Sequence, residues 1–136
     1  MKTEEDLVKM VRTSFMRRGF LVSTEVPMLS KRIDILCMNP DTNDIIAVEA
    51  KLQKWKRALQ QALTYRLCSN LVYIAIHHEF SHRVNIELLQ KHGVGLIVVN
   101  HSDIDISLEA SQSTIMHQGI KEDVMPYLGG EHPVVF

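Results

Sequence analysis

Residues 31–51, KRIDILCMNPDTNDIIAVEAK, contain two apolar runs separated by a cluster of turn-forming residues. Apolar and β-branched runs on either side of Asn, Pro, Asp and Thr are typical of a β-hairpin. Strands are therefore predicted over residues 31–38 and 45–51, with residues 39–44 as the connecting loop.

Three ionisable side chains interrupt these apolar runs: Asp34 in the first strand, and Glu49 and Lys51 at the end of the second. A charged group in an apolar strand costs free energy unless a partner compensates it. Alternation along each strand places these groups opposite two apolar sets: Ile33, Ile35 and Cys37, and Ile46, Val48 and Ala50. In a hairpin Asp34 and Glu49 come close together, and two neighbouring carboxylates favour a cation between them.

Helical and strand patterns alternate on both sides of the hairpin. Residues 3–18 predict a helix, because Thr3 and Asp6 have capping-box spacing and Gly19 follows as a stop signal. Further strands are predicted over residues 20–29, 71–76 and 94–99, and further helices over about 52–68 and 82–92. The order α-β-β-β-α-β-α-β predicts an α/β domain with a mixed central sheet of about five strands flanked by helices.

The composition is that of an ordinary globular chain, with 136 residues, 46% apolar and 23% charged. One domain is predicted over residues 1–108, and residues 109–136 are predicted as a C-terminal extension that packs on it or trails from it. No apolar run reaches the roughly 20 residues of a membrane helix, and residues 1–6 do not resemble a signal peptide. We expect a cytoplasmic protein whose Cys37 and Cys68 are buried thiols rather than a disulfide.

The charge distribution bears on nucleic-acid binding. A net charge of −1 lacks the basic excess that is usual in proteins that grip long duplex DNA. Basic residues nevertheless gather around the hairpin. If nucleic acid binds, we expect the contacts at Lys31, Arg32, Lys54, Lys56 and Arg57.

The acidic pair and the neighbouring lysine together predict a metal site. Carboxylate oxygens suit Mg²⁺ or Mn²⁺, and a metal held by Asp34 and Glu49 can acidify a bound water. Lys51 would orient that water or neutralise a phosphate. The alternative is an ion pair or a solvated strand end, since an acid-x-Lys triplet occurs about once by chance in a chain of this length.

Two segments resemble the core of the PD-(D/E)XK nuclease superfamily: RIDIL at residues 32–36 and IAVEAK at residues 46–51. Gln61 and Tyr65 are similar to the Gln-x-x-x-Tyr motif of RecB-like members. The predicted order of elements also resembles the restriction-endonuclease-like fold. The resemblance covers residues 4–100, with Ile33 at the position where the strict pattern has proline.

This resemblance implies metal-dependent hydrolysis of a phosphodiester bond in DNA. It makes Asp34, Glu49 and the backbone carbonyl of Ala50 the metal ligands, and Lys51 the catalytic lysine. Gln61 and Tyr65 are carried over as catalytic residues; Lys54, Ala58, Gln61 and Tyr65 share a helical stripe that we expect to admit a phosphate or water. The alternative for Tyr65 is a core position, and for Gln61 a solvated one.

The superfamily often adds a metal-binding glutamate from the first helix, and this chain offers Glu4 and Glu5. Helical spacing favours Glu4, because it lies on the same stripe as Leu7 and Val11. The alternative is that a glutamate in a first turn interacts only with the helix dipole. His78 and His82, four residues apart, form a weaker zinc pattern that lacks a third ligand.

The leading hypothesis is a Mg²⁺- or Mn²⁺-dependent DNA endonuclease. The alternatives are a non-catalytic nucleic-acid-binding module or subunit of a larger nuclease complex, and a purely structural α/β domain with a fortuitous Glu-Ala-Lys. Small members of the superfamily, Holliday junction resolvases among them, often act as homodimers. A homodimer or a partner protein is therefore expected here.

Overall fold

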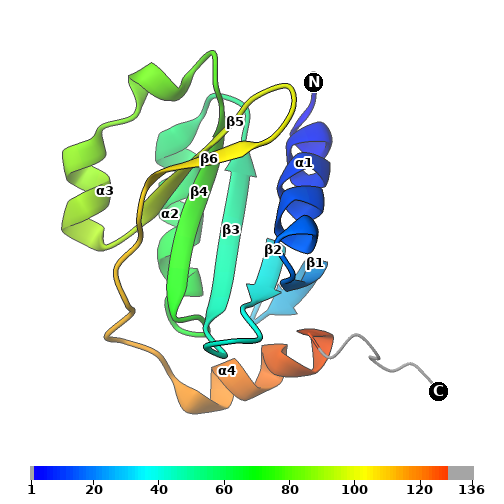
Figure 1. Ribbon diagram of the computed structural model, residues 1–136. Coiled ribbons are helices and arrows are strands. Elements are labelled where there is room, and N and C mark those ends of the chain that lie inside the picture. Colours follow the sequence, from blue (N-terminus) through cyan, green and yellow to red (C-terminus); the bar gives the residue numbers. More distant parts are fainter. Residues whose placement is uncertain (1, 129–136) are drawn as a thin grey trace.

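The computed structural model describes residues 2–128, in which helices cover both faces of a six-stranded mixed sheet (Figure 1). The helices are α1 (Glu4–Arg17), α2 (Trp55–Tyr65), α3 (Ile86–His92) and α4 (Gln118–Val124), with short 3₁₀ turns η1 (Ser81–Arg83) and η2 (Met125–Leu128). The strands are β1 (Leu21–Met28), β2 (Lys31–Met38), β3 (Ile45–Lys51), β4 (Leu71–His77), β5 (Gly95–Val99) and β6 (Ile104–Leu108).

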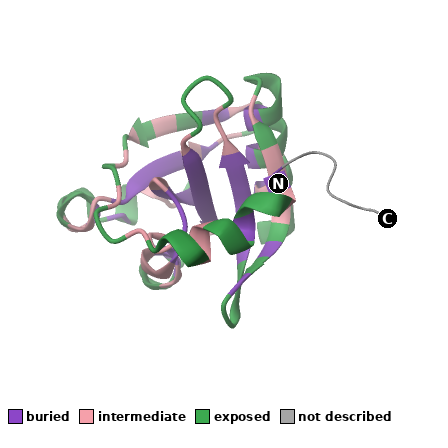
Figure 2. Cartoon of the chain, turned by 90° about the horizontal axis from the view of Figure 1, so that it is seen from below, coloured by how far each residue is buried: buried purple, intermediate pink, exposed green. Residues whose placement is uncertain are grey.

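The strands lie in the sheet in chain order, β1-β2-β3-β4-β5-β6. The first three pair antiparallel, β3, β4 and β5 pair parallel, and β6 returns antiparallel to β5. The parallel pairs need crossover connections, and α2 and α3 supply them. Because helices cover this centre from both sides, β3 and β4 are almost continuously buried, as Figure 2 shows.

Two hydrophobic cores lie on opposite faces of the sheet. On one face, α1 packs against strands β2 to β5 through Leu7, Val11 and Phe15, which are at most 2% exposed. On the other face, α2 packs its buried side against the sheet. Helix α3 and the C-terminal turn add Leu89 and Leu128 to the same core. The sheet is thus fixed from both sides, which holds the ends of β2 and β3 in place.

The ends of the helices follow local signals. Thr3 forms the predicted capping box with Asp6, and Gly19 ends the first helical segment with a φ of 88°. Helix α2 is shorter than the predicted 52–68, because it begins only after Lys54, which has a non-helical backbone. Within residues 2–128, no helix is long and apolar enough to cross a membrane.

The sheet has six strands rather than about five, because residues 104–108 add β6 at its edge. The segment IDISL alternates apolar and polar residues, which is the pattern of a half-buried strand, so the sequence carried a signal that the prediction left out. Residues 109–128 continue into α4 and η2, which lie against β1 and bury Val124 and Leu128. The rest of the predicted extension, residues 129–136, lies outside the described residues.

Simple alternation along β2 is wrong at one point. Ile33 belongs to the core under α2, whereas Ile35 and Cys37 belong to the core under α1. The pairing of β1 with β2 skips Glu25 and Asp34, between the pairs Thr24–Ile35 and Val26–Ile33, and Glu25 has a left-handed φ of 56°. Such a residue bends the strand and re-aims the side chains on either side of it. The bend lies directly at the predicted acidic site.

Gly95 offers a test of the packing between the inner strands. A Cβ added there would meet the Tyr73 ring and, at 2.6 Å, the backbone oxygen of Leu108. We therefore expect Gly95→Ala to lower the free energy of unfolding by about 1–3 kcal/mol in urea titrations. Gly119→Ala is the matched control, because the nearest atom there is in the His117 side chain at 3.1 Å. Equal unfolding midpoints for both variants would contradict the register of β4, β5 and β6.

Candidate functional site

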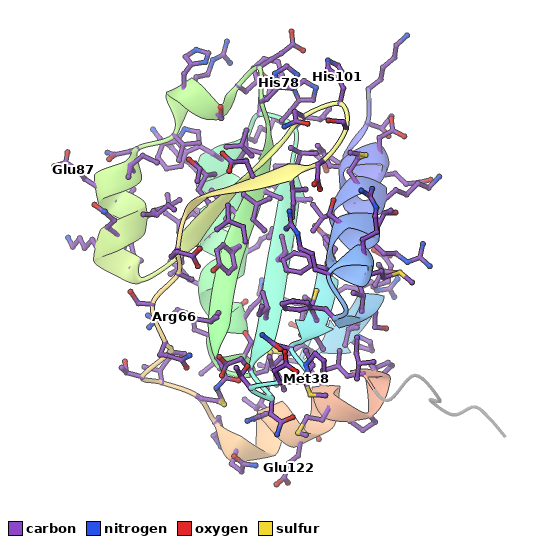
Figure 3. All side chains as sticks on the ribbon, viewed as in Figure 1. Met38, Arg66, His78, Glu87, His101 and Glu122 are labelled. Atoms are coloured by element: carbon purple, nitrogen blue, oxygen red, sulfur yellow. The ribbon has the colours of Figure 1, made fainter. Side chains whose placement is uncertain are left out.

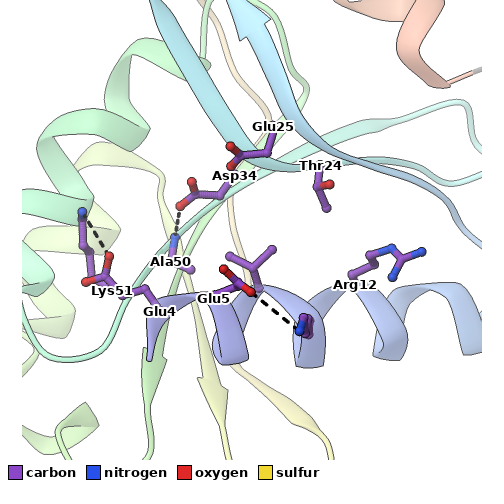
Figure 4. A pocket seen from close by; sticks show the side chains of 10 residues that line it. Glu4, Glu5, Arg12, Thr24, Glu25, Asp34, Ala50 and Lys51 are labelled. Atoms are coloured by element: carbon purple, nitrogen blue, oxygen red, sulfur yellow. Dashed lines mark hydrogen bonds and ion pairs between the residues drawn. The ribbon is translucent and has the colours of Figure 1, made fainter. Parts of the chain in front are cut away.

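A cleft of about 590 Å³ opens between the first part of α1, the middle of β1 and β2, and the end of β3 (Figure 4). Its lining includes five residues predicted from the sequence as ligands, as the catalytic lysine or as their alternatives: Glu4, Glu5, Asp34, Ala50 and Lys51. Residues distant in the sequence meet here because α1 crosses the face of the sheet above β2 and β3.

The Asp34 carboxylate takes the place of a backbone contact between two strands. The ladder between β2 and β3 ends at the pair Ile35–Val48. Beyond it, Asp34 Oδ2 accepts a hydrogen bond of 2.9 Å from the Ala50 backbone N–H (Figure 4). The side chain thereby satisfies an amide that the departing strand leaves unpaired, and the carboxylate is fixed at the floor of the cleft.

Glu49 is a buried carboxylate, with only 3% of the residue exposed. It lies on the face of β3 that is turned to α2, where the Tyr65 hydroxyl donates a hydrogen bond of 2.5 Å to Oε1. The same hydroxyl is 3.1 Å from the backbone oxygen of Arg32, which connects α2 to β2 as well. Asp34 lies close enough for its charge to raise the pKa of Glu49. The two acids therefore form one coupled pair.

The environment of this pair favours the protonated form. Burial raises the pKa of Glu49 to about 7 against the opposing effect of the Tyr65 hydrogen bond, and the nearby Asp34 charge adds to the rise. Burial also raises the pKa of Asp34, partly offset by the hydrogen bond from the Ala50 amide. Because Glu49 retains a proton near neutral pH, a cation can stabilise this acidic pair by replacing that proton.

Lys51 and Glu4 form an ion pair at the mouth of the cleft. Their Nζ and Oε1 atoms are 3.5 Å apart, and the Lys51 side chain is 19% exposed. Glu5 instead pairs with Lys9, at 3.7 Å along the same helix. Of the two candidate glutamates, Glu4 is therefore the one beside the lysine, although both line the cleft.

The predicted stripe on α2 is less open than expected. Ala58 is fully buried and Tyr65 is 1% exposed, because this side of the helix packs on the sheet. The expectation that Ala58 leaves room for a phosphate or water is therefore wrong. Gln61 is half-buried and is not part of the cleft lining. Tyr65 reaches the site through its hydroxyl, on the buried side of Glu49.

The predicted basic residues fall into two places. Lys54, Lys56 and Arg57 line a separate pocket of about 340 Å³, together with Arg83 from η1. Lys31 and Arg32 begin β2 and are exposed, and Arg32 pairs with Glu25 at 3.6 Å. The sequence pattern missed Arg83, because it follows a different strand and carries no local motif.

The histidine pair predicted as a weak zinc pattern has other neighbours. His78 stacks on His77 with ring centroids 4.6 Å apart and meets the edge of His101 at 5.0 Å (Figure 3). Over residues 2–128, no three His, Cys, Asp or Glu side chains form a group that would by itself hold a metal. Burial lowers the pKa of His77, and the adjoining His78 lowers it further.

Comparison with known proteins gives a shared fold. A solved structure of SPO1766, a protein of unknown function from Silicibacter pomeroyi, superposes with a TM-score of 0.74 at 20% identity, over 96% of this chain and 86% of that one. SfsA of Pyrococcus furiosus, solved with Ca²⁺, overlaps with a TM-score of 0.39 at 11% identity, over 79% of this chain and 61% of that one, which is too low to define a common fold. No family model and no curated protein matches the chain.

The raised pKa of Glu49 predicts a pH-dependent stability. Because folding raises it from 4.5 to about 7, the contribution is complete below about pH 4.5 and is lost as the pH rises through about 7. In buffer with a chelator, we expect the free energy of unfolding to fall across this range by up to about 3 kcal/mol relative to Glu49→Gln. Denaturant titrations at several pH values measure this difference.

Glu49→Gln is the appropriate reference, because it keeps an acceptor for Tyr65 but does not titrate. Tyr65→Phe removes the hydrogen bond that lowers the pKa of Glu49, so the loss of stability should shift to higher pH. A wild-type minus Glu49→Gln difference that is constant with pH would show that folding does not raise the pKa of Glu49.

Proposed function

We propose that this chain is a metal-dependent nuclease with a restriction-endonuclease-like fold, which hydrolyses phosphodiester bonds in DNA. One observation carries the proposal: Asp34 in β2 and Glu49 in β3 form a coupled acidic pair, and Asp34 lines an open cleft together with Lys51. The RIDIL and IAVEAK segments that resemble the PD-(D/E)XK core supply these three residues. The order of elements from α1 to β5 is compatible with that fold.

The donor set fits Mg²⁺ or Mn²⁺. Both carboxylates are hard oxygen ligands, and such ions are usually held by one or two carboxylates with water in the remaining positions. The raised pKa values of Asp34 and Glu49 also favour a bound metal ion, because a buried acidic pair is stabilised when a cation replaces its proton. The backbone carbonyl of Ala50 would add a third oxygen between them.

When bound, the metal supplies positive charge to the scissile phosphate and acidifies a water molecule. The chain's own residues then have separate tasks. Lys51 would neutralise charge that develops on the phosphate, which requires its ammonium group to turn from Glu4 to the substrate. Glu4, released by that movement, would be available as a further ligand or water acceptor. Tyr65 would hold Glu49 in position from the buried side.

The substrate we propose is DNA. Cations at the edge of the cleft and after β3 supply the charge that a phosphate backbone requires, while the net charge of −1 limits binding far from this edge. A homodimer or a partner protein would extend the contact with a long duplex. We also propose that the protein cleaves within a DNA strand rather than at its ends.

The second candidate is a nucleic-acid-binding module that does not cleave. The burial of Glu49 favours it, because this carboxylate is 3% exposed and is not part of the cleft lining. The ion pair between Lys51 and Glu4 favours it as well, since it occupies the lysine. A cleavage assay separates the two candidates.

Substitution of Lys51 tests catalysis directly. We expect the wild-type protein to cleave at least one substrate in a panel of linear, circular, single-stranded and branched DNA with Mg²⁺ or Mn²⁺. Lys51→Gln should reduce that cleavage by at least about 100-fold, because it removes a cation beside the phosphate. Glu5→Gln is the matched control: it also removes half of an ion pair at the cleft, but one made by Lys9. Equal cleavage by Lys51→Gln and the control, with circular dichroism unchanged, would end the proposal.

Thermal shift with Mn²⁺ tests metal binding independently of cleavage. A ligand at 100 times its dissociation constant stabilises a protein by about 2.7 kcal/mol. We expect Mn²⁺ to raise the Tm of the wild type, and the rise to disappear in Asp34→Asn. Glu4→Gln should weaken the shift more than Glu5→Gln if Glu4 becomes a ligand. A shift that persists unchanged in Asp34→Asn would place the metal elsewhere.

A further inference from the structure

A basic pocket of about 340 Å³ lies next to the cleft, at the beginning of α2. Two segments build it: residues 53–57, which follow β3, and Arg83 in η1, which follows β4. The carboxyl ends of parallel strands meet at one edge of a sheet, where ligands of open α/β sheets commonly bind. The pocket and the cleft are therefore neighbours at the same edge, with Lys51 lining one and Gln53 the other.

The lining of this basic pocket holds four cations and no acid: Lys54, Lys56, Arg57 and Arg83. None of the four forms an ion pair with a carboxylate of residues 2–128, whereas Lys9, Arg18, Arg32 and Lys51 each do. Like charges gathered in a concave site repel one another unless an anion joins them. In a chain whose net charge is −1, such a concentration of unpaired charge points to an anionic ligand.

The cations are also partly fixed in position. Arg83 donates a hydrogen bond of 3.2 Å from Nη1 to Gln53 Oε1, and its guanidinium lies 5.0 Å from the centre of the Phe80 ring. The Lys56 ammonium lies 5.8 Å from the centre of the Trp55 ring. Trp55 is 9% exposed, so it supports this wall of the pocket instead of offering a free face for a base. A held guanidinium with no carboxylate partner is suited to bind a phosphate through two N–H groups.

We infer that this basic pocket binds a phosphate group of a nucleic-acid strand, adjacent to the bond that the cleft would cleave. The inference rests on the proposed function for the identity of the strand, and it adds a second contact that the acidic pair does not make. Arg83 is the residue of this site that the sequence pattern did not indicate. Together with Arg57 it would guide the strand past Lys51. Bases are not read here, because the polar groups of the pocket are cationic donors.

The test compares two charge-matched variants, Arg57→Gln/Arg83→Gln and the control Arg17→Gln/Lys91→Gln. Each removes two positive charges from exposed positions, and the control positions lie on α1 and α3. Binding of fluorescein-labelled single-stranded and duplex DNA is followed by anisotropy with a chelator present, from about 25 to 200 mM NaCl. Oligonucleotides with a 5′-phosphate and with a 5′-hydroxyl form separate arms.

We expect the wild type and the control to bind alike, and the Arg57→Gln/Arg83→Gln variant to bind roughly tenfold more weakly or worse. The slope of log K against log[salt] should fall by about 1.5 in that variant, since two phosphate contacts are lost. An effect independent of the 5′ group indicates an internal phosphate, and an effect confined to 5′-phosphorylated DNA indicates a terminal one; either supports the pocket.

Equal affinities and slopes for the two variants would overturn the inference, as would wild-type protein that binds no DNA. The outcome is separable from that of the proposed function. Protein that binds through this pocket but never cleaves DNA would leave the inference standing and defeat the nuclease proposal. If the Arg57→Gln/Arg83→Gln variant cleaves DNA with an unchanged KM, the nuclease proposal stands and the inference about the basic pocket fails.

Discussion

The hydrogen bond from the Ala50 amide to the Asp34 carboxylate organises the region around it. It lies where the backbone ladder between β2 and β3 stops, so a side chain satisfies an amide that a strand would otherwise satisfy. This lets β2 bend away from β3 without leaving a buried polar group unpaired. The same bend opens the cleft beside α1 and gives the carboxylate a fixed position in it.

Beside this hydrogen bond, the free-energy cost of burying the Glu49 carboxylate is offset by specific partners. Glu49 lies one residue from the bonded amide, yet it faces the opposite core and depends on Tyr65 for its hydrogen bond. A buried acid with a raised pKa costs stability when it ionises, and a cation bound beside it reduces that cost. Sites of this kind, where a stable fold keeps an unfavourable group, are typical of functional positions.

The edge of the sheet that carries the acidic pair also gathers the cations. Three segments of the chain meet at this edge: the start of α1, the segment between β3 and α2, and the turn after β4. They bring negative charge into the cleft and positive charge into the basic pocket beside it. This separation of charge over one edge fits a ligand that carries several phosphates, because different phosphates can occupy the two hollows.

The sequence by itself determined the α/β class, the order of elements through β5 and the closeness of Asp34 to Glu49. These features depend on local signals within a few tens of residues: strand alternation, the turn between residues 38 and 45, and helix caps such as Thr3. Tertiary structure alone decided the bend at Glu25, the burial of Ala58 and Glu49, and the arrival of Arg83 beside Arg57. Each of these depends on contacts between segments far apart in the chain, and no local pattern of residues encodes such contacts.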